Sequence, residues 1–320
     1  MKRIVNAFLD KLNRGKRAYA VVALCAATAI ALPAQTFTTL FSFDGTDGLR
    51  PNAALVQATN GDLYGTTSGG GVQPAGAGGG GTVFKITPSG TITTLYNFCS
   101  QGGSLCTDGA GPYAGLVQAT NGDFYGTTEF GGSSSGCYQC GTVFKITPSG
   151  TLTTLYSFCT QSGCTDGTYP IGGLVQAANG DLYGTTAFGG DAACSFAGLG
   201  GCGTIFKITP SGALTTLYTF CTQSGCTDGQ SPAAGLVQAT NGDFYGTTQG
   251  GGAGCLPYSC GTVFKITPGG TLTTLYSFGT DGVSPLAGLV QAPMETSMGQ
   301  RQLAGPTAAA RSSGSPRVAH

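Results

Sequence analysis

Tryptophan is absent from the 320-residue chain, and only 9% of its residues are charged. The single histidine is His320, and Glu129 is the only glutamate between residues 35 and 292. The shortage of histidine excludes a nucleophile activated by imidazole in that stretch. A glycosidase with two carboxylates would have to recruit loop aspartates, and no glycine-rich phosphate motif follows a strand. These absences favour a non-enzymatic function.

The formal net charge of zero conceals an uneven distribution. Six basic residues and one acid, Asp10, lie in the first 34 positions. Between residues 35 and 292, five basic residues accompany twelve acidic ones, a formal net charge of −7. A mildly acidic domain without basic clusters lacks the side chains that neutralise phosphates, so we expect no nucleic-acid partner.

The N-terminus is typical of an export signal. A basic region ends at Arg17, an apolar run covers Ala18–Leu32, and a small-residue cleavage site follows Ala34. An uncleaved membrane anchor is the alternative, although the run is short for a membrane span. We expect residues 1–34 to be a signal peptide, with no membrane span after cleavage and a secreted or cell-surface location.

Internal repetition is the strongest signal in the sequence. Residues 35–292 are predicted to form one tandem-repeat domain with four complete units and a partial fifth: 36–90, 91–150, 151–212, 213–270 and 271–292. Asn-Gly pairs favour tight hairpins because both central residues need positive φ. The runs between turns are rich in β-branched and aromatic residues. Each unit therefore predicts four short strands.

We name these strands A to D by their motifs: Gly-Leu-Val-Gln-Ala, Leu-Tyr-Gly-Thr-Thr, Phe-Lys-Ile-Thr and Thr-Leu-Tyr-Ser-Phe. The D segment of the third unit carries apolar residues on both faces, with Leu152, Tyr156 and Phe158 expected on one and Leu155 on the other. A sheet packed between two others shows this pattern. The sequence predicts an all-β fold, a β-propeller of four-stranded blades. A β-solenoid is the alternative, although its coils are usually shorter.

The two ends of the repeat array suggest a ring. The chain opens with a lone D-type strand at Phe37–Phe43, and the fifth unit supplies strand A at Gly288–Ala292. After Ala292 the repeat pattern stops. Codons for the following residues can be chosen so that another frame reads Asn-Gly-Asp-Phe-Tyr-Gly-Thr-Thr, the missing turn and strand B. We infer a frameshift near residue 293 and expect residues 293–320 to be a disordered tail.

Twelve cysteines follow the signal in six close pairs: Cys99/Cys106, Cys137/Cys140, Cys159/Cys164, Cys194/Cys202, Cys221/Cys226 and Cys255/Cys260. Three pairs lie in D–A loops and three in B–C loops, while the shorter D–A loops of units one and five lack both cysteines. Corresponding loops thus contain both cysteines or neither, and this pattern predicts disulfides in an exported protein. Cys137-Tyr-Gln-Cys140 is alternatively a redox pair or a metal site, although no histidine accompanies it.

The B–C and D–A loops should emerge on one face of such blades and vary between units. They carry five aromatic residues that we predict to bind a ligand: Phe130, Tyr138, Phe188, Phe196 and Tyr258. The alternative is that these loops vary because nothing constrains them.

Recurrent aspartates have two interpretations. Those in Thr-Asp-Gly are expected to close turns: Asp47, Asp108, Asp166, Asp228 and Asp281. No cofactor is predicted other than Ca²⁺, for which Asp44 and Asp47 are the densest carboxylate pair. A second set follows Asn-Gly and is expected to serve the A–B turns: Asp62, Asp123, Asp181 and Asp243.

The recurring segments Gly-Leu-Val-Gln-Ala, Asn-Gly-Asp-(Leu/Phe)-Tyr-Gly-Thr-Thr and Gly-Thr-Val-Phe-Lys-Ile-Thr-Pro resemble the GloVer tandem repeat of exported bacterial "choice-of-anchor" proteins. The resemblance covers about residues 36–292 and involves whole units. It implies export and surface display, but no activity and no catalytic residues. We expect a non-enzymatic binding or surface-display module for an extracellular glycan, peptide or matrix partner. The alternative is an extracellular polysaccharide hydrolase or lyase that uses loop aspartates.

Overall fold

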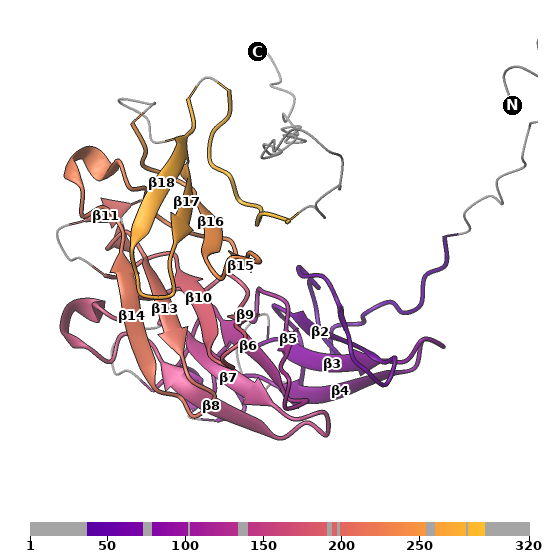
Figure 1. Cartoon of the computed structure of the whole chain (residues 1–320). Coiled ribbons are helices and arrows are strands. Elements are labelled where there is room, and N and C mark those ends of the chain that lie inside the picture. Colours follow the sequence, from indigo (N-terminus) through magenta and orange to yellow (C-terminus); the bar gives the residue numbers. More distant parts are fainter. Residues whose placement is uncertain are drawn as a thin grey trace, which may run out of the picture. The chain divides into compact units, whose positions relative to one another are not determined.

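The computed structural model describes residues 37–72, 79–101, 103–133, 140–190, 194–196, 199–253, 260–279 and 281–291. Within them, four four-stranded antiparallel sheets form the blades of an all-β, propeller-type fold (Figure 1). All four belong to the compact unit that begins at Phe41. The predicted fold class is therefore confirmed.

Each blade is a meander whose strands pair in chain order. Blade 1 contains β1 (Val56–Gln57), β2 (Leu63–Thr67), β3 (Thr82–Ile86) and β4 (Ile92–Asn97). Blade 2 contains β5 (Val117–Gln118), β6 (Phe124–Thr128), β7 (Thr142–Ile146) and β8 (Leu152–Ser157). Blade 3 contains β9 (Val175–Gln176), β10 (Leu182–Thr186), β13 (Thr204–Ile208) and β14 (Leu214–Thr219). Blade 4 contains β15 (Val237–Gln238), β16 (Phe244–Thr248), β17 (Thr262–Ile266) and β18 (Leu272–Ser277).

Short elements occupy the connections. A hairpin of β11 (Ser195–Phe196) and β12 (Leu199–Gly200) lies between β10 and β13. The helical segments are single 3₁₀ turns: η1 (Gly103–Leu105), η2 (Ser162–Cys164) and η3 (Ser224–Cys226). No helix in the described ranges is long and apolar enough to span a membrane.

The two predicted end strands are absent from the described residues. Residues 37–43 and 288–291 have no strand assignment, so that expectation is wrong. A strand needs a hydrogen-bonded neighbour, and among the described residues neither segment has one. Phe43 nevertheless packs edge-to-face on Phe84 with ring centroids 5.1 Å apart, as the D-strand phenylalanines of the complete blades do on the next blade.

The predicted facing of strand D is wrong because the strand contains a β-bulge. Val143 pairs with Tyr156 but Phe144 pairs with Thr154, so Leu155 is the extra residue. An extra residue inverts the side-chain alternation beyond it. Leu155 and Tyr156 therefore pack together in the core between blades 2 and 3, whereas Leu152 packs toward blade 1. The same register shift recurs in the other three blades.

Blades pack on one another through repeated aromatic contacts. The D-strand phenylalanine of each blade meets the C-strand phenylalanine of the next at 5.0–5.3 Å between centroids: Phe98–Phe144, Phe158–Phe206 and Phe220–Phe264. All six rings are fully buried. Edge-to-face packing adds to the stabilisation from apolar burial.

Two further features of Tyr-Gly-Thr-Thr explain its repetition. A Cβ on Gly126 would lie 2.6 Å from Cζ of Phe144, so the ring on strand C demands glycine on strand B. The first threonine bonds to the next blade, since Thr127 Oγ1 donates to the Gly172 carbonyl at 3.2 Å and Thr185 Oγ1 to the Ala234 carbonyl at 3.1 Å. The motif therefore joins strands within a blade and joins neighbouring blades.

Candidate ligand site on the loop face

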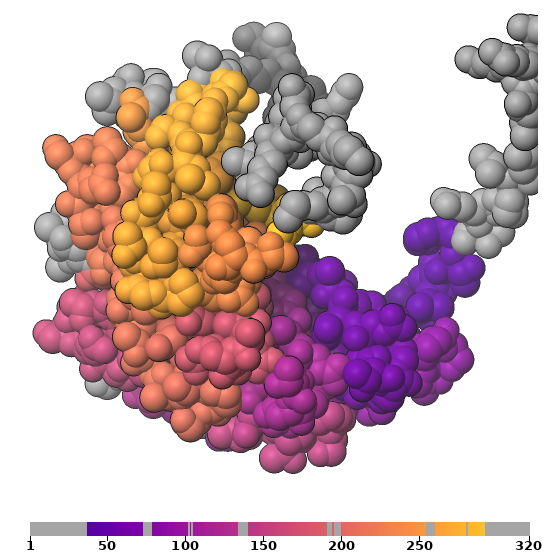
Figure 2. Space-filling view, in the orientation of Figure 1, coloured from indigo at the N-terminus to yellow at the C-terminus, as the bar shows by residue number. Residues whose placement is uncertain are grey.

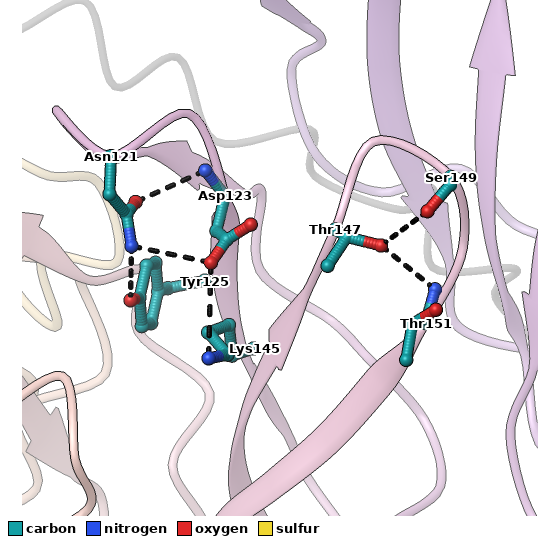
Figure 3. A network of polar contacts seen from close by, with 7 residues as sticks. All are labelled: Asn121, Asp123, Tyr125, Lys145, Thr147, Ser149 and Thr151. Atoms are coloured by element: carbon teal, nitrogen blue, oxygen red, sulfur yellow. Dashed lines mark hydrogen bonds and ion pairs between the residues drawn. The ribbon is translucent and has the colours of Figure 1, made fainter.

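The A–B and C–D turns form one face of the blades, which we call the turn face. In blade 2, Asn121 Oδ1 accepts the Asp123 N–H at 3.1 Å, and Asn121 Nδ2 donates to the Tyr125 hydroxyl at 3.2 Å (Figure 3). Asp123 Oδ2 lies 3.9 Å from Lys145 Nζ. The other three blades repeat the ion pair at 3.5–3.9 Å. The predicted turn role of these aspartates is confirmed.

The C–D turn lies beside this network. Thr147 Oγ1 shares a 2.8 Å hydrogen bond with Ser149 Oγ and accepts the Thr151 N–H at 3.0 Å (Figure 3). Blades 1 and 3 have the same contacts. The turn face is therefore nearly the same surface four times.

The B–C and D–A loops form the opposite face, which we call the loop face. Its Thr-Asp-Gly carboxylates are buried in the D–A loops that follow blades 1 to 3: Asp108, Asp166 and Asp228. Asp166 Oδ2 accepts the Tyr156 hydroxyl at 2.8 Å and the Thr160 N–H at 3.1 Å. Burial raises the pKa of Tyr156, and the hydrogen bond to Asp166 and the negative charge of that carboxylate raise it further. The aspartates close loops, as predicted, and are shielded from solvent.

The D–A loops are tied to the B–C loops by backbone. The Cys164 carbonyl accepts the N–H groups of Gly167 and of Gly190, each at 2.9 Å. The carbonyl groups of Cys106 and Cys226 make the same pair of bonds in the neighbouring blades. Loops of different length are therefore held on a common frame.

Disulfides close four of these loops, as predicted: Cys99–Cys106, Cys159–Cys164, Cys194–Cys202 and Cys221–Cys226. Cys140 and Cys260 are also disulfide-bonded, while Cys137 and Cys255 lie outside the described residues. Within the described ranges, the one group of three side chains close enough to share a metal is Cys194, Cys202 and Cys221. All three already belong to disulfides, so this group offers no thiolate ligand.

Asp44 and Asp47, the predicted calcium pair, serve their own turn. Asp44 Oδ1 accepts the N–H and the hydroxyl of Thr46 at 2.9 and 2.7 Å. Asp47 Oδ1 accepts the Asp44 N–H at 3.0 Å. The hydrogen bonds from Thr46 lower the pKa of Asp44. These contacts are those of an Asx turn, and they supply no argument for calcium.

Three aromatic side chains gather on the loop face between blades 2 and 3. Tyr169 contacts Phe130 and Phe188 edge-to-face, with ring centroids 5.7 and 5.4 Å apart. All three rings are half-buried, so each retains an accessible part. We call these three residues, with Glu129 and Tyr113, the aromatic cluster.

Glu129 gives the aromatic cluster a carboxyl group. Burial raises the pKa of Glu129, while a hydrogen bond from Tyr169 acts in the opposite direction. Burial, the hydrogen bond and the charge of Glu129 together raise the pKa of Tyr169. Tyr113 lies at the margin and is 48% exposed, and once ionised its phenolate contributes to the raised pKa of Tyr169. The cluster combines flat apolar surfaces with a strong hydrogen-bond acceptor.

The backbone directs Tyr169 into this position. Its φ is 64°, in the left-handed region that non-glycine residues rarely adopt. Its N–H donates to the Cys140 carbonyl of blade 2 at 3.2 Å, and its carbonyl accepts the Ala187 N–H at 3.0 Å. The equivalent residues Arg50 and Ser231 share the positive φ. The scaffold therefore presents whatever side chain occupies this position.

Comparison between blades singles out the aromatic cluster. Where blade 2 has Glu129 and Phe130, blade 4 has Gln249 and Gly250, and where blade 3 has Tyr169, blade 4 has Ser231. Glu129, Phe130 and Tyr169, which depart from the repeat, thus meet at one place on the loop face.

The structure brings together only two of the predicted binding aromatics, Phe130 and Phe188. Tyr138 and Tyr258 lie outside the described residues, and of Phe196 only the backbone in β11 is described. Sequence reasoning missed Tyr113, Glu129 and Tyr169 as members of one cluster. Their departure from the residues at matching positions was the available signal.

A family model describes the whole repeat array. The model of the Gloeobacter/Verrucomicrobia repeat matches residues 26–196 and again residues 105–309. This chain belongs to the Gloeobacter/Verrucomicrobia repeat family. The resemblance inferred from the motifs is thereby confirmed. No curated protein matches the sequence.

Solved structures share a distant likeness with this repeat protein. A Penicillium chrysogenum α-L-arabinanase in complex with arabinobiose is 12% identical over 77% of this chain and 71% of its own, with a TM-score of 0.45. A luciferin-regenerating enzyme is 15% identical over 72% of this chain, with a TM-score of 0.38. The chain spans 64% of that enzyme's length. Likenesses at these scores carry no argument about this chain.

Proposed function

We propose that this chain is an exported, non-enzymatic binding module whose loop face recognises an extracellular partner. The observation that carries the proposal is the aromatic cluster, where residues that depart from the repeat converge. Half-buried rings on a rigid frame bind ligands at low entropic cost. Disulfides in the loops support an oxidising, extracytoplasmic location, secreted or on the cell surface.

A glycan is the partner class that this surface fits best. Rings offer flat apolar contact to a sugar face, and a carboxyl such as Glu129 accepts hydrogen bonds from hydroxyl groups. A peptide or matrix ligand would use the same rings. No feature of the described residues favours the alternative hydrolase or lyase, since Asp108, Asp166 and Asp228 are buried in hydrogen-bonded loops.

The test is a glycan array with the full oxidised chain, followed by calorimetry on any hit. Repeat-matched variants remove the site with residues that other blades already carry: Tyr169→Ser, Phe130→Gly and Glu129→Gln. We expect Tyr169→Ser to weaken binding at least about tenfold, as for a buried aromatic anchor. Gln249→Glu, the reverse exchange in blade 4, is the matched control and should leave affinity unchanged.

Equal affinity for the wild type and Tyr169→Ser would show that the aromatic cluster is not the binding site. Peptide and matrix-protein arrays run in parallel identify the partner class. Release of reducing sugar or unsaturated product from a bound glycan would instead establish the enzyme.

A further inference from the structure

The interface between neighbouring blades is built three times from the same two halves. We call the side of a blade that packs on the following blade its trailing face, and the side that packs on the preceding blade its leading face. The trailing face of blade 2 contributes Ala119, Tyr125, Val143, Leu155 and Phe158. The leading face of blade 3 contributes Leu174, Leu182, Phe206, Ile208 and Leu214. The interfaces on either side use equivalent residues.

The trailing face of blade 4 has the same residue types. Of a following blade, the described residues supply only the segment 286–291, whose Ala287 carbonyl accepts the Thr247 hydroxyl at 3.3 Å, and the rest of this face is open. Leu275 is 50% exposed and Tyr276 48%, whereas the equivalent Leu155 and Tyr156 pack against the next blade. Phe278 is partly exposed, although its equivalents in the other blades are 0% exposed. In Figure 2 the β18 segment, in yellow, lies on the outside of the described part.

The leading face of blade 1 is open as well. Leu55 is 44% exposed, while its equivalents Leu116, Leu174 and Leu236 are 8–9% exposed. Leu63 is half-buried where Leu182 is fully buried. Phe43 covers only the Phe84 part of this face. Each open face thus matches one half of an interface that the chain already makes three times.

We propose that the trailing face of blade 4 binds the leading face of blade 1 in a second copy of this chain. The contact would continue the established interface between blades. Phe278 would displace Phe43 from Phe84 and pack there as Phe158 packs on Phe206. Leu55 of the second copy would pack on Leu275 in place of the segment 286–291. Exposed contiguous apolar surface of this kind marks an interaction site. Because the two faces differ, the contact is head-to-tail, and it closes into a ring or extends into a chain of copies. The proposal does not depend on ligand binding at the loop face.

The test is the mass of the full chain in solution, measured by light scattering over roughly 1–100 µM, where interfaces of ordinary size associate. Leu275→Asp disables the trailing face and Leu55→Asp the leading face. Both residues are exposed in the single chain, so both variants should keep the wild-type circular dichroism. Leu105→Asp, at an equally exposed leucine of a D–A loop, is the control.

The wild type and Leu105→Asp should show masses that rise with concentration to multiples of the monomer. Each aspartate variant alone should remain a monomer, because each retains only one working face. An equimolar mixture of the two variants should form a dimer and nothing larger, because the two remaining faces complement each other.

Three results would overturn the proposal. A monomeric wild type would mean that another segment covers the open face or that the face stays free. Self-association of Leu55→Asp alone would mean that two trailing faces pair with each other. A monomeric mixture would show that the two faces do not match.

Discussion

The turn face and the loop face are built from the same four blades, yet they differ in how strictly they repeat. On the turn face every blade has the same Asn-Gly-Asp turn and the same lysine–aspartate pair. On the loop face the connections differ in length, in disulfides and in aromatic residues. Within the part of the chain that the structure describes, bulky residues that other blades lack gather at one place there, the aromatic cluster around Tyr169.

This difference separates two kinds of constraint. A residue that every blade repeats serves a contact that every blade makes, such as the bond from Thr127 to Gly172. A residue present at one matching position only cannot be required by the blade itself. Tyr169 belongs to the second kind, because Ser231 adopts the same backbone conformation without its ring.

The largest expected loss of stability comes from the apolar interfaces between neighbouring blades, which lie between the turn face and the loop face. Phe158→Ala should destabilise the fold by about 3–5 kcal/mol, because it empties a fully buried site against Phe206. Phe278→Ala, at the matching position of the open face, should cost only about 1–2 kcal/mol. Urea unfolding followed by circular dichroism at low protein concentration measures both. Equal losses of stability in the two variants would show that the loss does not depend on how deeply the phenylalanine is buried.

A smaller loss is expected on the loop face when a disulfide is removed. The double variant Cys159→Ser/Cys164→Ser should lose about 2 kcal/mol, because the bridge closes a short loop. Thermal unfolding without reductant measures the change, and the wild type with reductant should fall further because several bridges open. An unchanged melting temperature would mean that the hydrogen bonds of Asp166 hold the loop unaided.

The next effect depends on pH and concerns Glu129. Burial raises its pKa above the ordinary 4.5, so the folded state holds this proton more tightly than the unfolded state. The resulting stabilisation is complete below the unfolded pKa and is lost as pH rises through the folded pKa. Glu129→Gln cannot ionise, so its stability relative to the wild type should increase as the pH rises above about 4.5. A difference that is constant with pH would exclude a raised pKa.

The smallest effect is expected on the turn face. Lys145→Met removes an ion pair whose partners are 29% and 21% exposed, and should cost about 0.5 kcal/mol or less. Urea titrations measure the free energy of unfolding of both proteins. The difference between the wild type and Lys145→Met should be smaller in about 1 M salt than in low salt, since salt screens exposed charges. A loss above about 2 kcal/mol would place the turn face among the main sources of stability and would break the contrast between the faces.

Most of the fold followed from the sequence because its signals are local. The Asn-Gly turns, the β-branched runs and the repeat period predicted four-stranded blades, and the paired cysteines predicted disulfides such as Cys99–Cys106. The facing of Leu155 was wrong because a bulge depends on the partner strand. The prediction of the two end strands was wrong because a strand needs an adjacent strand to pair with, and the motif by itself does not show whether one is present.

The candidate site was less accessible to sequence reasoning. Phe130 and Phe188 were predicted as loop-face aromatics, but their common neighbour Tyr169 lies in a different loop. Whether two loops meet depends on the packing of blades 2 and 3, which no single unit of the repeat encodes.

The sequence by itself determined the four-stranded blades, the turns and the disulfide pairs, because each arises from short motifs that lie close together along the chain. The tertiary structure alone decided that Glu129, Phe130, Tyr169 and Phe188 form one cluster, and that Leu55 and Leu275 are exposed while their equivalents are buried. Contacts between blades and exposure to solvent depend on what lies beside each blade, and the repeat motif is the same whether a neighbour is present or not.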